Sequence, residues 1–416
     1  MTTLDHLASL DARLVAAVRP LRLLAAASWP ASVQASFLAG WRGGDPVLPQ
    51  VEYPRLELAE TRRELDAVAG AADPGHPVGA YLRRSAGAWH LAAEIMEALG
   101  SHQVGSLSAR LYGTPGEALP GSDWTSVDAA GLFTVLADEL DAELDDADSQ
   151  AVIPAGQVRD ALQAQVDQVF DRHRVEVVLD PDLVAKAAAG PARIRLRSGS
   201  RFSAADQRQL FEHEVLVHTL TAINGREQPH LKSLGQTSPR VTATQEGLAT
   251  FAEQITGCID IRRMKRISLR ILAIQRVQGG ADFVETFRFF RDAGQGATDS
   301  FASAMRVFRG VPVTGGSAFC KDTVYLHGLL SVHTFFRWAL KHRRLNLLHW
   351  LFAGKLALQD VLALQPLFES GWIAAPTYLP HWAERTGNLA GLLAFSLFAN
   401  RIRLDALAAE DIVVGV

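Results

Sequence analysis

The sequence is poor in cysteine, and it lacks apolar runs long enough to cross a membrane. Only Cys258 and Cys320 occur in 416 residues. They could form one disulfide, but two thiols in so long a chain favour a reducing compartment. Asp5 and Asp11 interrupt any signal-peptide pattern, and the most apolar stretch, 323–338, holds two histidines and Arg337. We therefore expect a cytoplasmic protein with no membrane contact.

An excess of positive charge is also missing. The chain has 41 lysines and arginines against 45 acidic residues, a net charge of −4, which argues against nonspecific nucleic-acid binding. Repeats and low-complexity tracts are absent, and a hydrophobic content of 48% is ordinary for a globular protein. The acidic run 138–148 and the basic run 262–266 are interpreted as solvated helix faces.

Strand patterns are scarce as well. Only 175–179 and 192–197 read convincingly as strands; in the second, Ile194 and Leu196 alternate with arginines. The rest is helical, so we predict an α+β, mostly helical fold with a small antiparallel sheet. We divide it into an N-terminal helical region (1–170), a core (171–260) and a C-terminal helical region (261–416), packed as one unit. The arginine-bearing strand is expected at the sheet edge, where a peptide could add as a further strand.

A candidate catalytic motif lies in the core: His213 and Glu214 are followed by His218, five residues after the first histidine. Ser203 and Asp206 predict a capping box at the start of its helix, and Asn224-Gly225 predicts the end. Residues five apart point about 140° away from each other on a regular α-helix. The two imidazoles would then diverge, so we predict a π-turn over 215–217 that returns them to one face.

A second motif supplies a carboxylate 33 residues after His213, in the segment Gln245-Glu246-Gly247-Leu248-Ala249. Thr242 or Thr244 is expected to cap its helix, and Gly247 to allow close approach to the first helix. Two histidines and a glutamate with an open fourth position suit one catalytic zinc ion. His213, His218 and Glu246 are thus the predicted ligands.

Two further carboxylates have predicted roles near this zinc ion. Glu214 is the candidate general base. Glu253 is a candidate hydrogen-bond acceptor for one of the ligating imidazoles, because such rings usually donate to an outer acceptor. A purely structural zinc site would not need Glu214.

Together these segments resemble the QEGLA-motif family, whose animal members include the microtubule-associated tyrosine carboxypeptidases. The resemblance covers about residues 20–400, and the alanine- and arginine-rich composition is typical of a bacterial member. It implies a zincin-like metallopeptidase with the ligands and base named above. The matching residues are Leu111-Tyr112-Gly113-x-Pro115, His213-Glu214-x-x-x-His218, Asn224-Gly225-x-x-Gln228-Pro229, Gln245-Glu246-Gly247-Leu248-Ala249 and Lys321-Asp322-x-x-Tyr325-Leu326-x-Gly328.

Peptide hydrolysis at such a site needs two more groups. The tetrahedral oxyanion needs a second electrophile besides the metal, for which Tyr325 is the candidate and His327 the alternative. A carboxypeptidase also needs a cation for the terminal carboxylate, and we place Lys321 first and Arg240 second.

The sequence therefore predicts a zinc metallopeptidase, carboxypeptidase-like, acting on the C-terminal tail of a peptide or protein. It leaves the oligomeric state open. A second interpretation is a regulatory or binding protein with a structural or vestigial zinc site, because bacterial relatives are described as modulators of flavohaemoglobin expression. A third is a metal-free helical interaction module.

Overall fold

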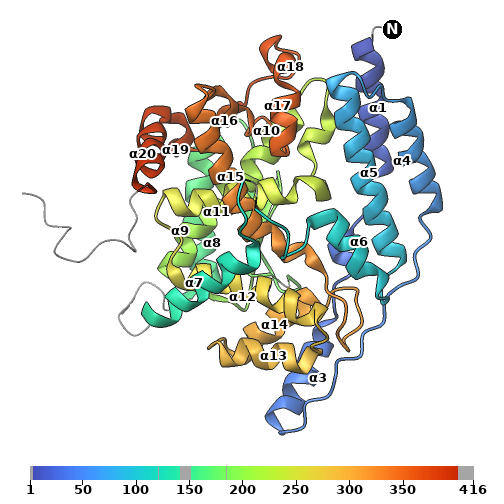
Figure 1. Cartoon of the computed structure of the whole chain (residues 1–416), viewed down its shortest axis with the longest axis vertical. Helices are drawn as coiled ribbons and strands as arrows, with labels where there is room; N and C mark the ends of the chain where they lie inside the picture. Colours follow the sequence, from blue (N-terminus) through green and yellow to red (C-terminus); the bar gives the residue numbers. More distant parts are fainter. Residues whose placement is uncertain (1–2, 120, 141–150, 184, 402–416) are drawn as a thin grey trace, which may run out of the picture.

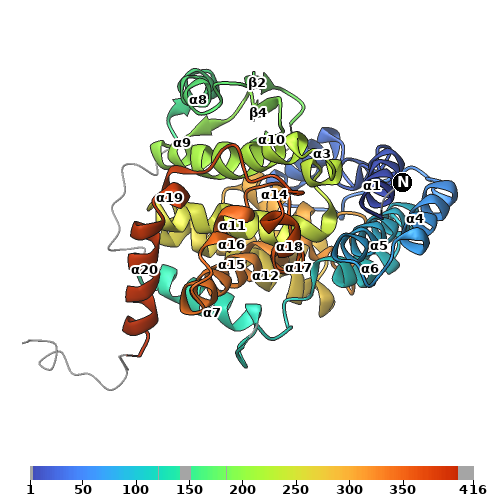
Figure 2. The same cartoon turned by 90° about the horizontal axis from the view of Figure 1, so that it is seen from above.

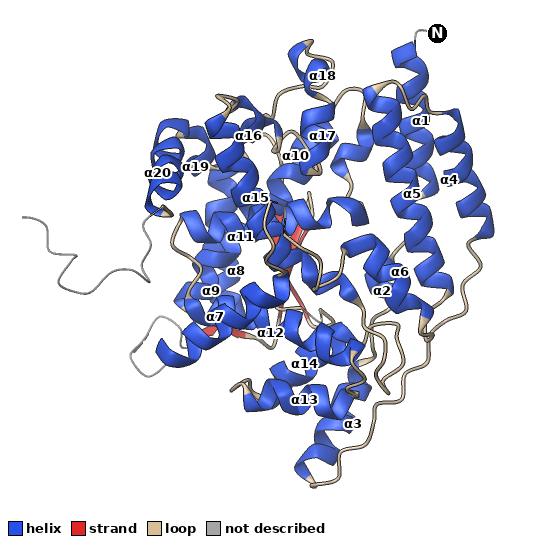
Figure 3. Ribbon diagram, in the orientation of Figure 1, coloured by secondary structure: helices blue, strands red, loops and turns tan. Residues whose placement is uncertain are grey.

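The computed structural model describes residues 3–119, 121–140, 151–183 and 185–401. The chain is mostly helical, with two small sheets (Figure 3). Most of the acidic run 138–148 lies outside the described residues. The helices before the first strand are α1 (Thr3–Ala17), α2 (Leu23–Ala26), α3 (Ala31–Arg42), α4 (Ala59–Ala71), α5 (Pro77–Glu97), α6 (Gln103–Tyr112) and α7 (Ser126–Leu140).

The N-terminal helices α1, α4 and α5 pack side by side on one side of the molecule (Figure 1). Leu7, Leu10 and Leu14 recur every three to four residues along α1 and are buried, as an amphipathic helix requires. Pro20 falls between α1 and α2, because its ring and missing N–H do not fit a helix interior.

The sheets are formed by β1 (Ile153–Pro154), β2 (Glu176–Asp180), β3 (Ala187–Ala189), β4 (Arg193–Arg197) and β5 (Arg201–Phe202). The predicted strands are confirmed as β2 and β4, and Ile194 and Leu196 are fully buried. Their arrangement was predicted wrongly. β2 and β4 run parallel, and only β3 pairs antiparallel with β4. Because the order is β2-β4-β3, the arginine-bearing strand is central and cannot accept a peptide as an extra strand.

The middle of the chain forms a layered core. Figure 2 shows β2, β4 and α8 stacked over α9 and α10, with α11 and α15 beneath. The arginines on the outer face of β4 are paired, Arg195 with Asp180 at 3.2 Å and Arg193 with Glu176 at 3.9 Å. The elements are α8 (Ala155–Val169), α9 (Ala204–Leu210), a π-helix (Phe211–Thr219), α10 (Leu220–Glu227), two 3-10 helices (Lys232–Gly235 and Pro239–Val241) and α11 (Thr242–Ile255).

After α11 the described chain is helical, as predicted. The remaining elements are α12 (Ile261–Gln278), α13 (Phe283–Asp292), α14 (Ala297–Val307), a 3-10 turn (Cys320–Asp322), α15 (Thr323–Lys341), α16 (Asn346–Trp350), α17 (Leu358–Ala363), α18 (Gln365–Glu369), α19 (His381–Glu384) and α20 (Thr386–Ala399). No helix among the described residues is both long and apolar enough to cross a membrane. Cys258 and Cys320 are both free thiols.

One apolar cluster runs through all three predicted regions, from Leu7 on α1 to Leu393 on α20. The predicted division at 170 and 260 has no counterpart in this cluster and stays a prediction. Helices α11 and α15 cross at very short range within the core. A Cβ on Gly247 would lie 2.3 Å from the carbonyl oxygen of Gly328, so only glycine fits at this crossing. Gly247 therefore admits α15, and not the histidine helix as we expected.

Candidate active site

The histidine motif lies in a π-helix, Phe211–Thr219, which continues α9 and leads into α10. This confirms the predicted bulge, and it is longer than the single turn expected. A π-helix closes its hydrogen bonds between residues five apart, so His213 and His218 come to stand over one another. Their ring centroids are 4.8 Å apart, at an interplanar angle of 80°.

The ends of this helix agree only in part with the sequence prediction. Ser203 and Asp206 form the expected capping box before α9. The expected stop at Asn224-Gly225 is wrong, because α10 continues to Glu227. A Cβ on Gly225 would lie 2.0 Å from the carbonyl oxygen of Leu234, so this glycine serves a close packing contact inside the helix.

Glu246 lies on α11, opposite the two histidines. Its Oε2 is 3.5 Å from Nε2 of His213 and 3.6 Å from Nε2 of His218, and the candidate ligand atoms of the three residues all lie within 4.8 Å of one another. Tetrahedral ligands placed about 2.0–2.1 Å from a zinc ion are separated by about 3.3–3.4 Å. The donor set and its spacing therefore fit a single metal ion.

The start of α11 differs from the prediction. Neither Thr242 nor Thr244 caps the helix, whose N-cap position is Val241 at the end of a 3-10 turn. Thr244 instead accepts a hydrogen bond from the backbone N–H of Leu358 at 3.1 Å. The start of α11, which positions Glu246, is thus fixed by a tight backbone turn and by a contact to the segment at α17.

Glu253 holds the ring of His213 from the outer side, as expected. Its Oε1 is 2.6 Å from Nδ1 of His213, which leaves Nε2 directed towards Glu246. Arg263 donates to both oxygens of Glu253, at 3.1 and 3.2 Å. Burial would raise the pKa of the Glu253 carboxyl, but Arg263 and His213 outweigh it and hold the pKa at about 2. Arg263, expected on a solvated face, is therefore part of the site.

His213 and Glu246, paired at 3.5 Å across the site, both have strongly shifted pKa values. Burial disfavours the charged forms of both, yet Glu246 and Glu253 raise the pKa of His213 well above its ordinary value. Lys321 and the two histidines likewise hold the pKa of the buried Glu246 carboxyl well below its usual range. Glu246 is thus a carboxylate, the form in which it could bind a metal ion.

A second group of charges adjoins Glu246, which we call the Tyr325 cluster: Glu246, Arg270, Arg306, Arg309, Lys321, Asp322 and Tyr325. Lys321 donates to Oε1 of Glu246 at 3.3 Å, and its Nζ lies 5.2 Å from the centroid of the Tyr325 ring. Arg306 binds both oxygens of Asp322 at 2.6 Å and donates to the Tyr325 hydroxyl oxygen at 3.2 Å. Two sequence candidates, Lys321 and Tyr325, are therefore brought next to the predicted ligands.

The other sequence candidates are placed differently. Glu214 is partly exposed on the π-helix and close enough to act electrostatically on His213. His327 is partly buried on α15, where burial lowers its pKa, and it is not among the three grouped donors. Arg240 is bound by Asp360, at 2.6 and 2.8 Å, so its guanidinium is already engaged by a carboxylate.

Lys355 was missed by the sequence reasoning. It is buried, and its ammonium donates to the carbonyl oxygen of His218 at 3.2 Å and to Gln245 Oε1 at 3.1 Å. Thr221 on α10 donates to the same amide oxygen at 2.9 Å. The Gln245 side chain therefore connects α11 to both Lys355 and α10. Burial lowers the pKa of Lys355 to about 8 despite the nearby Glu246 and Glu214. A lysine alone in the apolar stretch 351–358 was the available signal.

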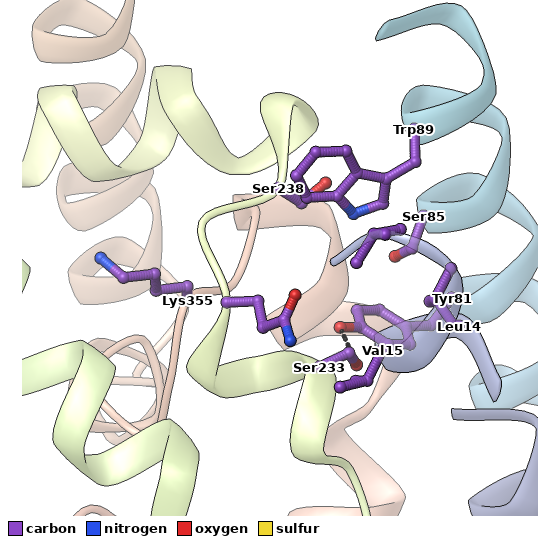
Figure 4. A pocket seen from close by; sticks show the side chains of 10 residues that line it. Leu14, Val15, Tyr81, Ser85, Trp89, Ser233, Ser238 and Lys355 are labelled. Atoms are coloured by element: carbon purple, nitrogen blue, oxygen red, sulfur yellow. Dashed lines mark hydrogen bonds between the residues drawn. The ribbon is translucent and has the colours of Figure 1, made fainter. Parts of the chain in front are cut away.

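Figure 4 shows a cavity beside this lysine, between α1, α5 and the 3-10 helix that carries Ser233. Tyr81 and Ser233 face each other across it with their hydroxyl oxygens 2.8 Å apart, while the Lys355 ammonium points away from it. Its volume of about 10 Å³ accommodates at most one water molecule. This cavity is therefore a packing gap rather than a substrate site.

Comparison with known protein families decides the relationship of the chain. Residues 36–401 match the family described as microtubule-associated tyrosine carboxypeptidase. The chain belongs to this family. A comparison with curated proteins found no match. Membership of the tyrosine carboxypeptidase family implies a carboxypeptidase-like activity and a peptide or protein substrate. The three candidate metal ligands and the residues of the Tyr325 cluster all lie within the matched region.

Proposed function

We propose that this protein is a zinc-dependent carboxypeptidase with a zincin-like core, acting in the cytoplasm on the C-terminal tail of a peptide or protein. His213, His218 and Glu246 would hold the ion. The observation that carries the proposal is the separation of Glu246 Oε2 from the two imidazole nitrogens, 3.5 and 3.6 Å. Family membership supplies the reaction class independently of this geometry.

The residues around the ion supply the proton transfers. A zinc ion held by three protein ligands lowers the pKa of a bound water and polarises the scissile carbonyl. Glu214, next in sequence to His213, would accept the proton of the attacking water and deliver it to the leaving amine. Glu253 keeps His213 in the tautomer with Nε2 free for the ion.

Tyr325 is the better placed of the two candidates for stabilising the oxyanion. Arg306 donates to its hydroxyl oxygen, so the phenolic proton remains free to be donated to another acceptor. His327 has no comparable contact to the described residues around Glu246. Lys321, bonded to Glu246, would add positive charge beside the scissile carbonyl, whereas Arg240 is committed to Asp360.

The test compares wild-type protein with Glu214→Gln. Zinc would be measured by elemental analysis, and hydrolysis by mass spectrometry of a digested peptide library. We expect stoichiometric zinc in both proteins, removal of C-terminal residues by the wild type, and a rate lower by about 10²–10⁴-fold in the variant. Turnover retained in Glu214→Gln would refute the assignment of the base.

A matched control is available on the same helix. Burial raises the pKa of Glu212 to about 7, and its Oε2 has no hydrogen-bond partner among the described residues. Glutamine resembles a protonated glutamate, so Glu212→Gln should keep both zinc and turnover. Stoichiometric zinc without hydrolysis in the wild type would instead favour the regulatory interpretation, and absence of zinc would favour the metal-free module.

A further inference from the structure

The Tyr325 cluster contains more positive than negative charge. Four cations (Arg270, Arg306, Arg309 and Lys321) face two carboxylates (Glu246 and Asp322). A metal ion bound to Glu246 would neutralise part of the negative charge that this carboxylate offers to Lys321. Unpaired cations in a protein interior are costly, so an excess of this kind calls for a negatively charged ligand.

The contacts identify which cations lack a partner. Lys321 is bonded to Glu246, and Arg306 to both oxygens of Asp322. Arg270 Nε lies 3.7 Å from Asp322, beyond hydrogen-bond distance, on an oxygen that Arg306 already occupies. Arg309 forms no ion pair with any residue that the structure describes. The buried Nε atoms of Arg270 and Arg309 both lack a hydrogen-bond acceptor there.

The electrostatics agree with this count. Burial and, after it, repulsion by Arg306 lower the pKa of both Arg270 and Arg309 to about 10, because the attraction of Asp322 offsets only part of these two effects. An ordinary arginine does not lose its proton in proteins, so these two sites are unusually unfavourable for a cation. A bound carboxylate would remove that penalty, and the planar guanidinium fork matches its two oxygens.

The position is also appropriate for the end of a substrate. A continuous series of contacts leads from Glu246 through Lys321 and the Tyr325 ring to Arg306. Arg270, only weakly paired with Asp322, and Arg309 both interact electrostatically with Tyr325. In a carboxypeptidase substrate the terminal carboxylate lies one residue, about 3.8 Å, beyond the scissile unit. Arg270 and Arg309 both interact electrostatically with Asp322 and Tyr325, the residues that adjoin Lys321 and Arg306, so they lie next to the part of the cluster that leads from Glu246.

We propose that Arg270 and Arg309 form the receptor for the terminal carboxylate of the substrate. This assignment rests on the proposed carboxypeptidase function, and it transfers to Arg270 and Arg309 the role first predicted for Lys321 or Arg240. Lys321 and Arg240 are already engaged by Glu246 and Asp360, whereas Arg270 and Arg309 have free donors.

The experiment uses one peptide in two forms, N-acetyl-Ala-Ala-Ala-Tyr with a free C-terminal carboxylate and the same peptide as a C-terminal amide. Binding of each to the full-length protein stripped of metal is measured by calorimetry, so the result does not depend on turnover. We expect the wild type to bind the acid about 10- to 100-fold more tightly than the amide, because charge-assisted hydrogen bonds are the strong ones.

Arg309→Gln and Arg270→Gln should each reduce binding of the acid towards that of the amide and leave the amide unchanged. Arg288→Gln, at an exposed arginine of α13, is the matched control and should keep the full preference. Removal of an unpaired buried charge should leave the thermal midpoint unchanged or higher, which distinguishes lost recognition from misfolding.

Three results would overturn the inference: equal binding of acid and amide by the wild type, an intact preference in both arginine variants, or a preference lost only in Lys321→Gln. Hydrolysis by the zinc-loaded protein is measured separately. A preference for the acid without any hydrolysis would contradict the proposed function and leave the carboxylate receptor standing. Hydrolysis of the acid and the amide at equal rates would contradict the carboxylate receptor and leave the hydrolytic function standing.

Discussion

Two tyrosines in this protein are surrounded by charge, and their surroundings differ. Tyr81 is buried under the guanidinium of Arg240, 5.8 Å from its ring centroid, and Tyr325 is partly exposed under Arg306 at 5.7 Å. Around Tyr81, Asp360 accepts hydrogen bonds from Arg240 and Arg84, and Asp11 accepts two from Ser233. A buried Nε without an acceptor occurs in both places, but Arg84 beside Tyr81 still binds Asp360 through its Nη2, whereas Arg270 and Arg309 beside Tyr325 donate no hydrogen bond to a described carboxylate.

The difference separates a structural network from a binding site. In the Tyr81 cluster (Asp11, Tyr81, Ser233, Arg240 and Asp360) the carboxylates are saturated by donors of the protein itself, so nothing remains to hold a ligand. In the Tyr325 cluster the donors outnumber the acceptors, and the neighbouring Glu246 faces two imidazole nitrogens. Changes in the first should therefore affect stability, and changes in the second should affect ligand or metal binding.

The largest effect on stability is expected at Asp360. Asp360→Asn leaves the buried Arg240 without its counter-charge and should lower the free energy of unfolding by about 3–5 kcal/mol. Urea denaturation would measure it, and zinc affinity of the folded protein should not change. Glu246→Gln should show the opposite pattern, with metal affinity lost and stability much less affected. Equal loss of zinc in the two variants would contradict the distinction between the clusters.

A somewhat smaller effect is expected at Asp11, in the same cluster. Burial raises the pKa of Asp11 from 3.8 to about 6 despite its hydrogen bonds to Ser233. Because the folded-state pKa is the higher one, the stabilising contribution is complete below pH 3.8 and is lost as the pH rises through 6. The shift corresponds to about 3 kcal/mol.

Asp11→Asn should remove this dependence. The free energy of unfolding of both proteins would be measured by urea denaturation between pH 4 and pH 8. As the pH rises, the free energy of unfolding of the variant should increase relative to that of the wild type. A difference that stays constant across this range would show that Asp11 does not carry the titration.

The smallest effect is expected at Glu253, on the other side of the comparison. Glu253→Gln keeps an acceptor for His213 but removes the charge that Arg263 and His213 share. Loss of such an outer partner typically weakens metal binding about 10- to 100-fold. Competition with a chromophoric zinc chelator would give the affinity, and Glu212→Gln serves as control. Unchanged affinity would mean that the ring of His213 is held by packing alone.

Much of the fold was accessible from local patterns. The capping box at Ser203, the break at Pro20 and the alternation around Ile194 each depend on neighbours within a few residues. The π-helix was predictable because two histidines five apart share one face only in that geometry. Glu253 was found from the requirement that a ligating imidazole have an acceptor.

The remaining features depend on segments distant in the sequence. Gly225 looked like a helix end, and only the approach of Leu234 shows that it is a packing position. The order of strands in the sheet follows from pairings that the pattern of β4 alone does not specify. Arg263 lay in a basic run and Lys355 stood alone in an apolar stretch, but their partners appear only when α12 and the segment before α17 meet the core.

The π-helix also bears on how such sites are related by descent. One extra residue in a helix, taken up as a bulge, leaves the flanking turns in phase with their neighbours. Deleting one residue between Glu214 and His218 would give an ordinary α-helix with histidines four apart, again presenting both rings to Glu246. A single-codon insertion or deletion thus converts one histidine spacing of this candidate metal site into another, so searches that demand a fixed histidine spacing pass over proteins built like this one.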